Sequence, residues 1–385
     1  MSYERALSTM KLAWEFAQAP ELIYLNHAAV APWPRRTQEA VNRFAEENLR
    51  LGASRYGQWL ATESTLKRQL ATLLHAPSAD DIALLKNTSE GLSIIAYGLP
   101  WQTGDNIVIS AEEFPSNRIV WESLRGRGVE VRAVVIDGDN PEDALINAMD
   151  SNTRLLSISS VQYGSGRVLQ LEKIGAACRQ RNTLFCVDGI QSIGALRLDV
   201  QAIGADFVVA DGHKWLLGPE GLALFYIHPN ARDRLNLQQY GWHMIENHSD
   251  YDTQTWQVAK SARRFECGSP NMLGIHALSA SVSLLLDAGM ANIEQEVLEN
   301  AHALLTMLAG NSKLTLLTPR QRGRFAGIVT FKTHDIDPQV LLQHLKEHHI
   351  ICAYRGGGIR FSPHFYTSKD KLERAVRVVN EYVRD

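Results

Sequence analysis

Two short stretches in the middle of the chain decide the fold: Leu184-Phe185-Cys186-Val187 followed by Asp188, and Phe207-Val208-Val209-Ala210 followed by Asp211. Runs that are apolar on both faces are typical of strands buried inside a parallel sheet. Similar runs occur at residues 106–110, 129–136, 155–159 and 223–227, with helical stretches such as Leu171–Arg181 between them. Strands that alternate with helices predict an α/β protein with a mostly parallel sheet and helices on both faces.

The length and the changing pattern along the chain predict two domains. With 385 residues the chain is longer than one hydrophobic core usually supports. After about residue 260, helical stretches mix with apolar strands at 327–331, 350–353 and 358–361. We therefore expect a large domain over residues 21–255 and a smaller α+β domain over residues 256–385. Residues 1–20 are expected to form an N-terminal segment that packs on the small domain.

Composition narrows the class of protein. Lys and Arg number 39 against 42 Asp and Glu, so the net charge of −3 gives no support for a nucleic-acid or anionic-membrane partner. The four cysteines form no CxxC pair, which favours a reducing compartment over a disulfide framework or zinc site. The N-terminus lacks the apolar core of a signal peptide, and no apolar run reaches the ~18 residues of a membrane span. We expect a soluble, cytoplasmic protein.

Polar residues follow several of the expected strands, where open α/β sheets bind their ligands. Asp188 and Gln191 follow one strand, Lys214 follows another, and Thr88-Ser89 open a helix. Each has an ordinary structural reading, because aspartates at such turns often cap helices and lysines often lie on the surface. Together, an acid, a lysine and a hydroxyl-rich helix start suit an aldehyde cofactor that carries a phosphate and a protonated ring nitrogen.

Five segments in order carry a resemblance to a known family: Tyr24–Ala29, Asn87–Gly91, Val187–Gly194 with Ala210–Gly221, Arg264–Asn271 and Arg360–Tyr366. They resemble the class V aminotransferases, fold-type I enzymes that use pyridoxal 5'-phosphate. That family includes cysteine desulfurases, kynureninases and isopenicillin-epimerase-like proteins. The resemblance covers most of the chain. It implies a large domain with a mostly parallel seven-stranded sheet and a smaller α+β C-terminal domain.

The resemblance also implies how the cofactor is held. Lys214 is expected to bind it as a Schiff base and then to move the proton at the substrate α-carbon. Asp188 is expected to pair with the pyridine nitrogen, and Gln191 to hydrogen-bond the phenolic oxygen of the ring. Thr88 and Ser89 are expected to bind the phosphate at a helix N-terminus.

Other matched positions complete the expected site. His213 is expected near the phosphate, and Phe114 is expected to stack on the cofactor ring. Arg360 matches the arginine that grips the substrate α-carboxylate, and Asn26 and His27 are expected to contribute to the substrate pocket.

The resemblance implies a homodimer with shared active sites. In the family, the segment that matches Arg264–Asn271 reaches the neighbouring subunit, so Gly268 and Ser269 are expected to help bind the phosphate in the partner's site. Arg55 is placed equally well in the pocket or on the surface.

The chain departs from the desulfurase pattern at three places. Cys352 reads as a core residue of a strand, and the loop that carries the desulfurase cysteine is missing between Arg355 and Arg360. Phe114 stands where desulfurases have a histidine. Asp211 stands where they have a hydroxyl, and because a carboxylate repels a phosphate we expect it to point elsewhere.

These departures favour an aminotransferase that acts at the α-carbon of an amino acid. Desulfurase-like, C–S or β-lyase and epimerase activities on the same scaffold remain alternatives, because all share the same first proton abstraction. A non-catalytic binding protein of this fold is the alternative of another class, but Lys214, Asp188 and Arg360 are all retained. The His344–His348 stretch fits a short metallopeptidase pattern, yet such motifs often arise by chance, and we expect no metal site.

Overall fold

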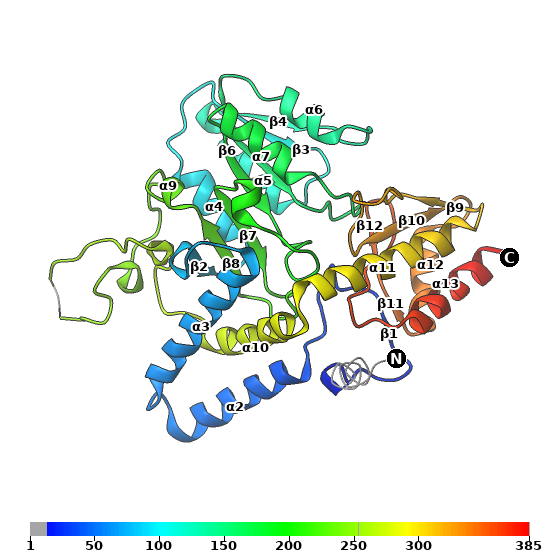
Figure 1. The fold of residues 1–385 in the computed structure, drawn as a ribbon, viewed down its shortest axis with the longest axis horizontal. Coiled ribbons are helices and arrows are strands. Elements are labelled where there is room, and N and C mark those ends of the chain that lie inside the picture. Colours follow the sequence, from blue (N-terminus) through cyan, green and yellow to red (C-terminus); the bar gives the residue numbers. More distant parts are fainter. Residues whose placement is uncertain (1–13, 253, 385) are drawn as a thin grey trace.

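The computed structural model describes residues 14–252 and 254–384, so most of the predicted N-terminal helix lies outside the described residues. A seven-stranded sheet forms its centre, in the order β2-β8-β7-β6-β5-β3-β4 (Figure 1). The strands are β2 (Ile82–Leu85), β3 (Asn106–Ser110), β4 (Glu130–Val134), β5 (Thr153–Ser159), β6 (Leu184–Asp188), β7 (Phe207–Asp211) and β8 (Ala223–Ile227). Within this sheet only β8 runs against its neighbours. The expected mostly parallel, seven-stranded sheet is confirmed.

Alternation along the central strands divides the core into two layers. In β6, Phe185 and Val187 join a cluster with residues of α3, α7 and α10, whereas Leu184 and Cys186 join a cluster with residues of α4 and α5. Successive side chains of a strand point to opposite faces, so a strand covered on both sides must be apolar at every position. This explains why these strands read as continuous apolar runs.

Helices fill both layers and build much of the C-terminal part. They are α2 (Arg35–Leu51), α3 (Tyr56–Leu74), α4 (Thr88–Gly98), α5 (Ser116–Glu122), α6 (Pro141–Asn147), α7 (Leu171–Gln180), α8 (Val200–Ile203), α9 (Pro229–Arg232), α10 (Met272–Ala288), α11 (Met290–Ala309), α12 (Pro338–Glu347) and α13 (Lys369–Arg384). Four 3₁₀ turns add η1 (Ala79–Asp81), η2 (Ser123–Arg127), η3 (Trp242–Met244) and η4 (Ala262–Phe265). Among the described residues no single helix is long and apolar enough to cross a membrane, and α10 with α11 meets that test only as a pair bent by 85°.

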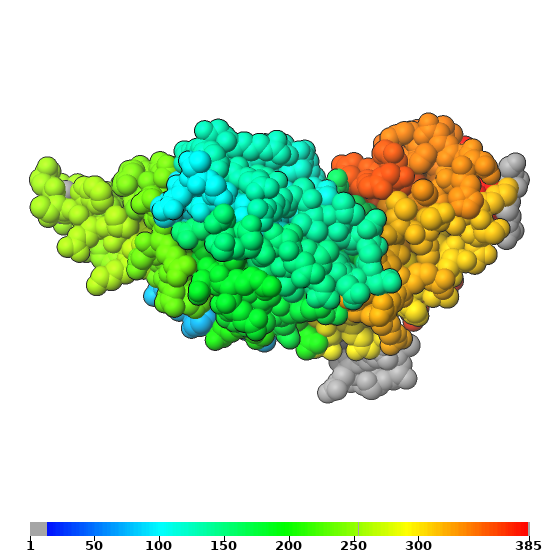
Figure 2. Space-filling view, turned by 90° about the horizontal axis from the view of Figure 1, so that it is seen from above, coloured from blue at the N-terminus to red at the C-terminus, as the bar shows by residue number. Residues whose placement is uncertain are grey.

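A second, antiparallel sheet lies beside the large one, in the order β12-β13-β10-β9. Its strands are β9 (Leu314–Leu316), β10 (Val329–Thr333), β12 (Ala353–Arg355) and β13 (Gly358–Phe361). Apolar residues of α11, α12 and α13 pack with it in a separate cluster. Figure 2 shows the orange atoms of this C-terminal part next to green atoms of the preceding part of the chain.

Contacts between the two parts involve both ends of the chain. β1 (Ile23–Tyr24) pairs with β11 (Ile350–Ile351), so an early segment packs with the C-terminal part. Helix α10 instead packs on α2 and α3. The boundaries proposed from sequence, after residues 20 and 255, stay predictions.

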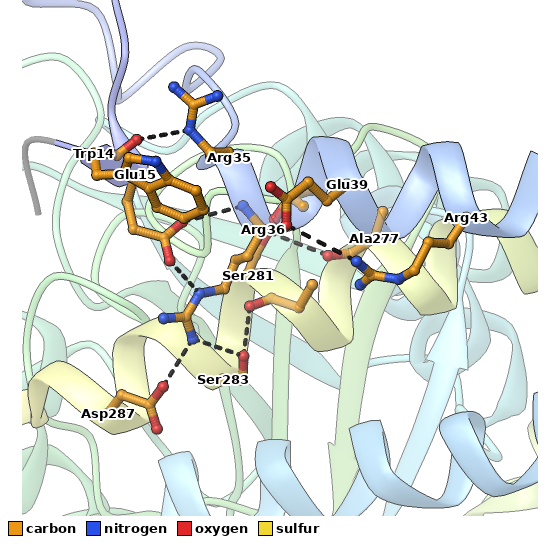
Figure 3. A network of polar contacts seen from close by, with 12 residues as sticks. Trp14, Glu15, Arg35, Arg36, Glu39, Arg43, Ala277, Ser281, Ser283 and Asp287 are labelled. Atoms are coloured by element: carbon orange, nitrogen blue, oxygen red, sulfur yellow. Dashed lines mark hydrogen bonds and ion pairs between the residues drawn. The ribbon is translucent and has the colours of Figure 1, made fainter. Parts of the chain in front are cut away.

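Arg36 anchors the start of the described chain (Figure 3). Its guanidinium donates to Glu15 at 2.7 Å and to Asp287 of α10 at 2.8 Å. Phe16 stacks on Tyr366 with ring centroids 3.5 Å apart. The segment that begins at residue 14 is thereby held between α2, α10 and the residues that follow β13.

Candidate active site

The candidate site lies where the parallel strands end. β2 and β7 both run against β8, so the carboxyl ends of β2, β3, β5, β6 and β7 meet at one edge of the sheet. Asp188 is the last residue of β6, Lys214 follows β7, and Thr88 opens α4 after β2. Phe114 follows β3. Four strand ends therefore bring together side chains that are far apart in the sequence.

Lys214 is a buried amine, 8% exposed, whose Nζ lies 5.5 Å from the centre of the Phe114 ring. Burial lowers the pKa of Lys214 to about 8, because the charged form loses its hydration. Asp188 opposes this shift, while the nearby Arg360 adds to it. A considerable share of the amine is thus neutral near pH 8, where it can act as a nucleophile or a base.

Asp188 is fully buried beside Lys214. Burial raises its pKa to about 6. Two groups act to lower this pKa: the backbone N–H of Ile190, which donates to Oδ1 at 3.0 Å, and the charge of Lys214. At neutral pH the carboxylate is ionised, as it must be to stabilise a protonated ring nitrogen.

Gln191 connects the turn after β6 to the lysine loop. Trp215 Nε1 donates to its Oε1 at 3.0 Å, and its Nε2 donates to the carbonyl of Ala28 at 3.1 Å. One amide hydrogen is left for the phenolic oxygen expected there. The two segments touch at Gly194, where a Cβ would lie 2.3 Å from the carbonyl oxygen of Trp215.

The first turn of α4 offers donors for an anion. Asn87 caps the helix by accepting from the N–H of Glu90 at 2.9 Å. The hydroxyl of Ser89 donates to that of Ser116. Two buried polar atoms here, Thr88 Oγ1 and His213 Nδ1, have no hydrogen-bond partner among the described residues.

Asp211 corrects an expectation from the sequence. We expected its side chain to point away from the phosphate position, but Oδ1 accepts the backbone N–H of Thr88 at 3.0 Å. Its other oxygen lies 3.9 Å from Nδ1 of His213. The carboxyl group therefore lies at the same helix N-terminus that the sequence assigns to the phosphate.

Arg360 lies on β13, across from the sheet edge. It is 2% exposed, its Nη1 donates to the carbonyl of Tyr163 at 2.9 Å, and its Nε has no partner. Burial lowers its pKa to about 10, and the charge of Arg355 adds to this. Within residues 14–252 and 254–384 neither arginine forms an ion pair, so a substrate carboxylate would meet an uncompensated guanidinium.

Asn26 and His27 differ in what they can offer a substrate. Asn26 keeps a buried Oδ1 without a partner. His27 uses both ring nitrogens inside the protein, since Nδ1 lies 2.8 Å from the carbonyl of Ser362 and Nε2 lies 2.6 Å from the hydroxyl of Tyr366. Burial lowers the pKa of His27 to about 4, so the ring stays neutral. This pairing suits a residue that positions its neighbours.

Gly268 and Ser269 are the residues expected to reach a second subunit. Gly268 follows η4, and a Cβ there would meet nothing within 4 Å. Ser269 is half-buried beside it. The roles of Gly268 and Ser269 in a dimer stay predictions. Arg55, which the sequence places either in the pocket or on the surface, is exposed and lies 3.4 Å from Glu47.

None of the four cysteines lies free in the site. Cys178, Cys186 and Cys352 are buried, and Cys267 is half-buried with its thiol donating to Gln239. Burial raises the pKa of Cys352 to about 12, so its thiolate is scarce at neutral pH. Between β12 and β13 the chain turns through Gly356 and Gly357 alone, both with positive φ.

Two clusters bear on the expectation that no metal is bound. Glu63, His243 and Glu266 lie close enough to share an ion, but Lys67 Nζ lies 2.9 Å from an oxygen of each carboxylate and already supplies a positive charge. His344 of α12 and His348, which follows that helix, have ring centroids 4.3 Å apart, without a third ligand among the described residues.

Glu113 was missed from the sequence. It is buried next to Phe114, where the N–H of Ser159 donates to Oε1 at 2.8 Å and Asn117 donates to Oε2 at 2.9 Å. Burial raises its pKa to about 7. Because Ser159 pairs with Asp188 across β5 and β6, Glu113 ties the Phe114 turn to the strands that hold the acid. In the sequence nothing distinguishes Glu113 from the adjacent Glu112, so no sequence signal pointed to it.

The unpaired buried atoms fit a phosphate-bearing cofactor and a carboxylate substrate. They include Thr88 Oγ1 at the start of α4, His213 Nδ1 next to Lys214, Arg360 Nε on β13, and Asn26 Oδ1. Buried polar atoms without partners are uncommon in proteins, and those at binding sites are met by the ligand. The residues present therefore suit pyridoxal phosphate.

Comparisons with known proteins agree with this fold and site. The profile of the family described as Aminotransferase class-V matches residues 23–377. A "Probable cysteine desulfurase" of Methanothermobacter thermautotrophicus is 29% identical over 91% of this chain and 92% of its own length. A "Cysteine desulfurase" of Yersinia pestis is 31% identical over 85% of this chain and 82% of its own length.

Solved structures share the fold. The apo cysteine desulfurase of Thermococcus onnurineus NA1 superimposes with a TM-score of 0.88 at 23% identity, over 97% of this chain and 98% of that one. The cystine C–S lyase C-DES, in complex with cysteine persulfide, gives 0.86 at 24% identity over 94% and 98%. Fold and site together define a fold-type I enzyme that depends on pyridoxal phosphate. The chain belongs to the class-V aminotransferase family.

Proposed function

We propose that the protein is an aminotransferase that acts at the α-carbon of an amino acid, with Lys214 moving the proton. The observation that carries the proposal is the placement of Lys214, a buried amine with a pKa of about 8 between Asp188 and Arg360. An amine whose pKa lies near the working pH can both take up and return a proton.

Each residue would have a distinct part. Pyridoxal phosphate, when bound, supplies an electron-withdrawing ring that makes the α-carbon of an attached amino acid acidic. Asp188 keeps the ring nitrogen protonated, and Phe114 packs against the ring face. Arg360 binds the α-carboxylate through two parallel N–H donors and so orients the α-hydrogen toward Lys214.

The names of the relatives raise cysteine desulfuration as a rival. Such a reaction needs a thiolate that reaches the sulfur of the substrate. Cys352 is 6% exposed with a pKa of about 12, and the short turn after β12 leaves no mobile loop for it. Cys267 is the one thiol that is part-exposed. These observations support an activity that uses no cysteine of the protein.

Elimination from a sulfur-containing amino acid is the second candidate. One similar solved structure is named as a cystine C–S lyase, and an elimination of this kind needs only the base and the cofactor. The lysine and arginine described above would serve it equally. The two candidates differ in whether the substrate loses a β-substituent or passes its amino group to a keto acid.

A homodimer with shared sites is part of the proposal. Residues between α9 and η4 project from the body of the molecule, as both views show (Figures 1 and 2). This projection carries large exposed rings at Tyr240, Tyr251 and Trp256. Exposed apolar groups of this size favour burial against another surface.

The test is product analysis with a panel of L-amino acids in D₂O, with and without pyruvate or 2-oxoglutarate. We expect equal amounts of a keto acid from the donor and an amino acid from the acceptor, with deuterium at the α-carbon of recovered donor. Lys214→Ala should abolish both signals, and Lys173→Ala, at an exposed lysine of α7, should leave them unchanged.

Other products would redirect the assignment. A keto acid and ammonia formed without an acceptor would favour elimination, and recovery of the D-isomer would favour epimerisation. Sulfur transfer from L-cysteine that is lost in Cys352→Ala or Cys267→Ala would contradict the cysteine-free route. Failure of all amino acids to exchange the α-hydrogen would remove the enzyme assignment.

A further inference from the structure

Asp211 places a carboxyl group where an anion is expected. Its side chain is 13% exposed, and Oδ1 accepts the N–H of Thr88, the first residue of the eleven-residue helix α4. This N–H belongs to the free donors that make a helix N-terminus attractive to phosphate. The Thr88 side chain is also close enough to lower the pKa of Asp211, His213 Nδ1 lies 3.9 Å from Oδ2 of Asp211, and neither Thr88 Oγ1 nor His213 Nδ1 has a hydrogen bond of normal geometry among the described residues.

The surroundings of Asp211 do little to neutralise it. Burial raises its pKa to about 6, the N–H of Thr88 and the charge of Lys214 act in the other direction, and Glu220 adds a further upward shift. The charge of Asp211 also raises the pKa of Asp188. Burial lowers the pKa of His213 to about 4, so this neighbour is neutral at working pH. An ionised Asp211 would therefore face a phosphate with no cation between them except Lys214.

We propose that Asp211 binds the cofactor phosphate in its protonated form, so that the protein takes up a proton at this carboxyl group when the cofactor binds. A neutral carboxyl group removes the repulsion and donates its O–H to a phosphate oxygen. Its carbonyl oxygen can still accept the N–H of Thr88. The proton comes from solvent and returns there on release, so the balance involves no other reactant.

The sign of the pH effect follows from linkage. Binding raises the pKa of Asp211, so affinity is greatest below the pKa of the free protein, about 6, and falls as the pH rises above it. The inference rests on the proposed cofactor site but concerns the phosphate alone. It gives this chain a cofactor affinity that weakens in alkaline conditions.

The experiment uses the full-length apoprotein and pyridoxine 5'-phosphate, which carries the phosphate but has no aldehyde to react with Lys214. We expect the wild-type dissociation constant to rise about 20-fold between roughly pH 6.5 and pH 8. In Asp211→Asn, which keeps the shape and the acceptor for Thr88, it should change by much less and be lower at pH 8. Calorimetry in buffers of different ionisation enthalpy should show about one more proton taken up by the wild type than by the variant.

The outcomes separate this inference from the proposed function. If wild type and Asp211→Asn show parallel pH profiles and equal proton uptake, Asp211 stays ionised and the inference is overturned. If the folded wild type binds neither pyridoxine 5'-phosphate nor pyridoxal phosphate at any pH, the cofactor site itself is wrong. Should Asp211→Asn not fold, Asp211→Ser supplies the neutral comparison, and wild-type proton uptake near zero at pH 7 still contradicts the inference.

Discussion

His364 Nε2 lies 3.1 Å from the backbone carbonyl oxygen of Trp215, the residue that follows Lys214. The N–H of Phe365 donates to the other ring nitrogen, Nδ1, at 2.8 Å, which leaves Nε2 as the donor. Burial holds the pKa of His364 well below its usual range, so the ring is neutral and this tautomer persists. The segment that follows β13, the strand that carries Arg360, is thus tied directly to the lysine loop.

Replacing His364 by leucine should loosen both segments. The carbonyl of Trp215 would be buried without a donor, which costs about 1–3 kcal/mol of the free energy of unfolding. Urea denaturation measures this cost. His302→Leu, at an exposed histidine of α11, is the control and should change stability by much less. Equal losses in the two variants would show that the bond to Trp215 does not matter.

The pH dependence of cofactor attachment should report the pKa of Lys214. Only the neutral amine adds to an aldehyde, so the rate at which the apoprotein binds pyridoxal phosphate should rise with pH and level off above about 8. The charge of Asp188 raises the pKa of Lys214, so in Asp188→Asn the plateau should begin at lower pH. Stopped-flow absorbance measures these rates. A profile that still rises steeply above pH 10 would mean that Lys214 is not desolvated as described.

Arg360 should be needed for its shape as well as its charge. Arg360→Lys keeps one positive charge but loses the two parallel donors that bind a carboxylate, so kcat/KM for the best amino acid should fall about 10- to 100-fold. The loss should appear mainly in KM. Steady-state kinetics measure it, and Arg322→Lys, at an exposed arginine, should behave as wild type. An unchanged KM would place the carboxylate elsewhere.

The main elements were predictable because their causes are local. Strands such as β6 and β7 must be apolar at each position to be covered on both faces, and the acids at their ends therefore stand out in the sequence. β9 was missed because Leu314–Leu316 is only three residues long and half-buried, with its pairing partner in distant β10. So short a run carries little periodicity.

The contact between Asp211 and Thr88 could not have been predicted from spacing. Asp211 ends β7 and Thr88 opens α4 just after β2, and these two strands are not neighbours, because β8 lies between them in the sheet. Repulsion between like charges is a sound argument about an isolated pair, but it omits the free N–H groups at the start of α4, which attract any acceptor. The burial of Glu113 depended likewise on Ser159 and Gln162, which come from another strand end.

Gly194 offers a sharp test of how the Asp188 turn and the Lys214 loop fit together. A Cβ at Gly194 would lie 2.3 Å from the carbonyl oxygen of Trp215, and its φ of +98° is strained for any other residue. Gly104 is a matched control, because its φ is +94° but a Cβ there meets nothing within 4 Å. We expect Gly104→Ala to cost about 1–2 kcal/mol of unfolding free energy for the backbone strain alone.

Gly194→Ala should cost more, because backbone cannot move aside as a flexible side chain can. It should also weaken cofactor binding, since any shift that relieves the clash separates Gln191 from Trp215 and moves Lys214 relative to Asp188. Chemical denaturation and cofactor titration measure the two effects. Equal stability losses at Gly194 and Gly104, with cofactor affinity unchanged, would show that the close approach of these two segments does not set the position of the lysine.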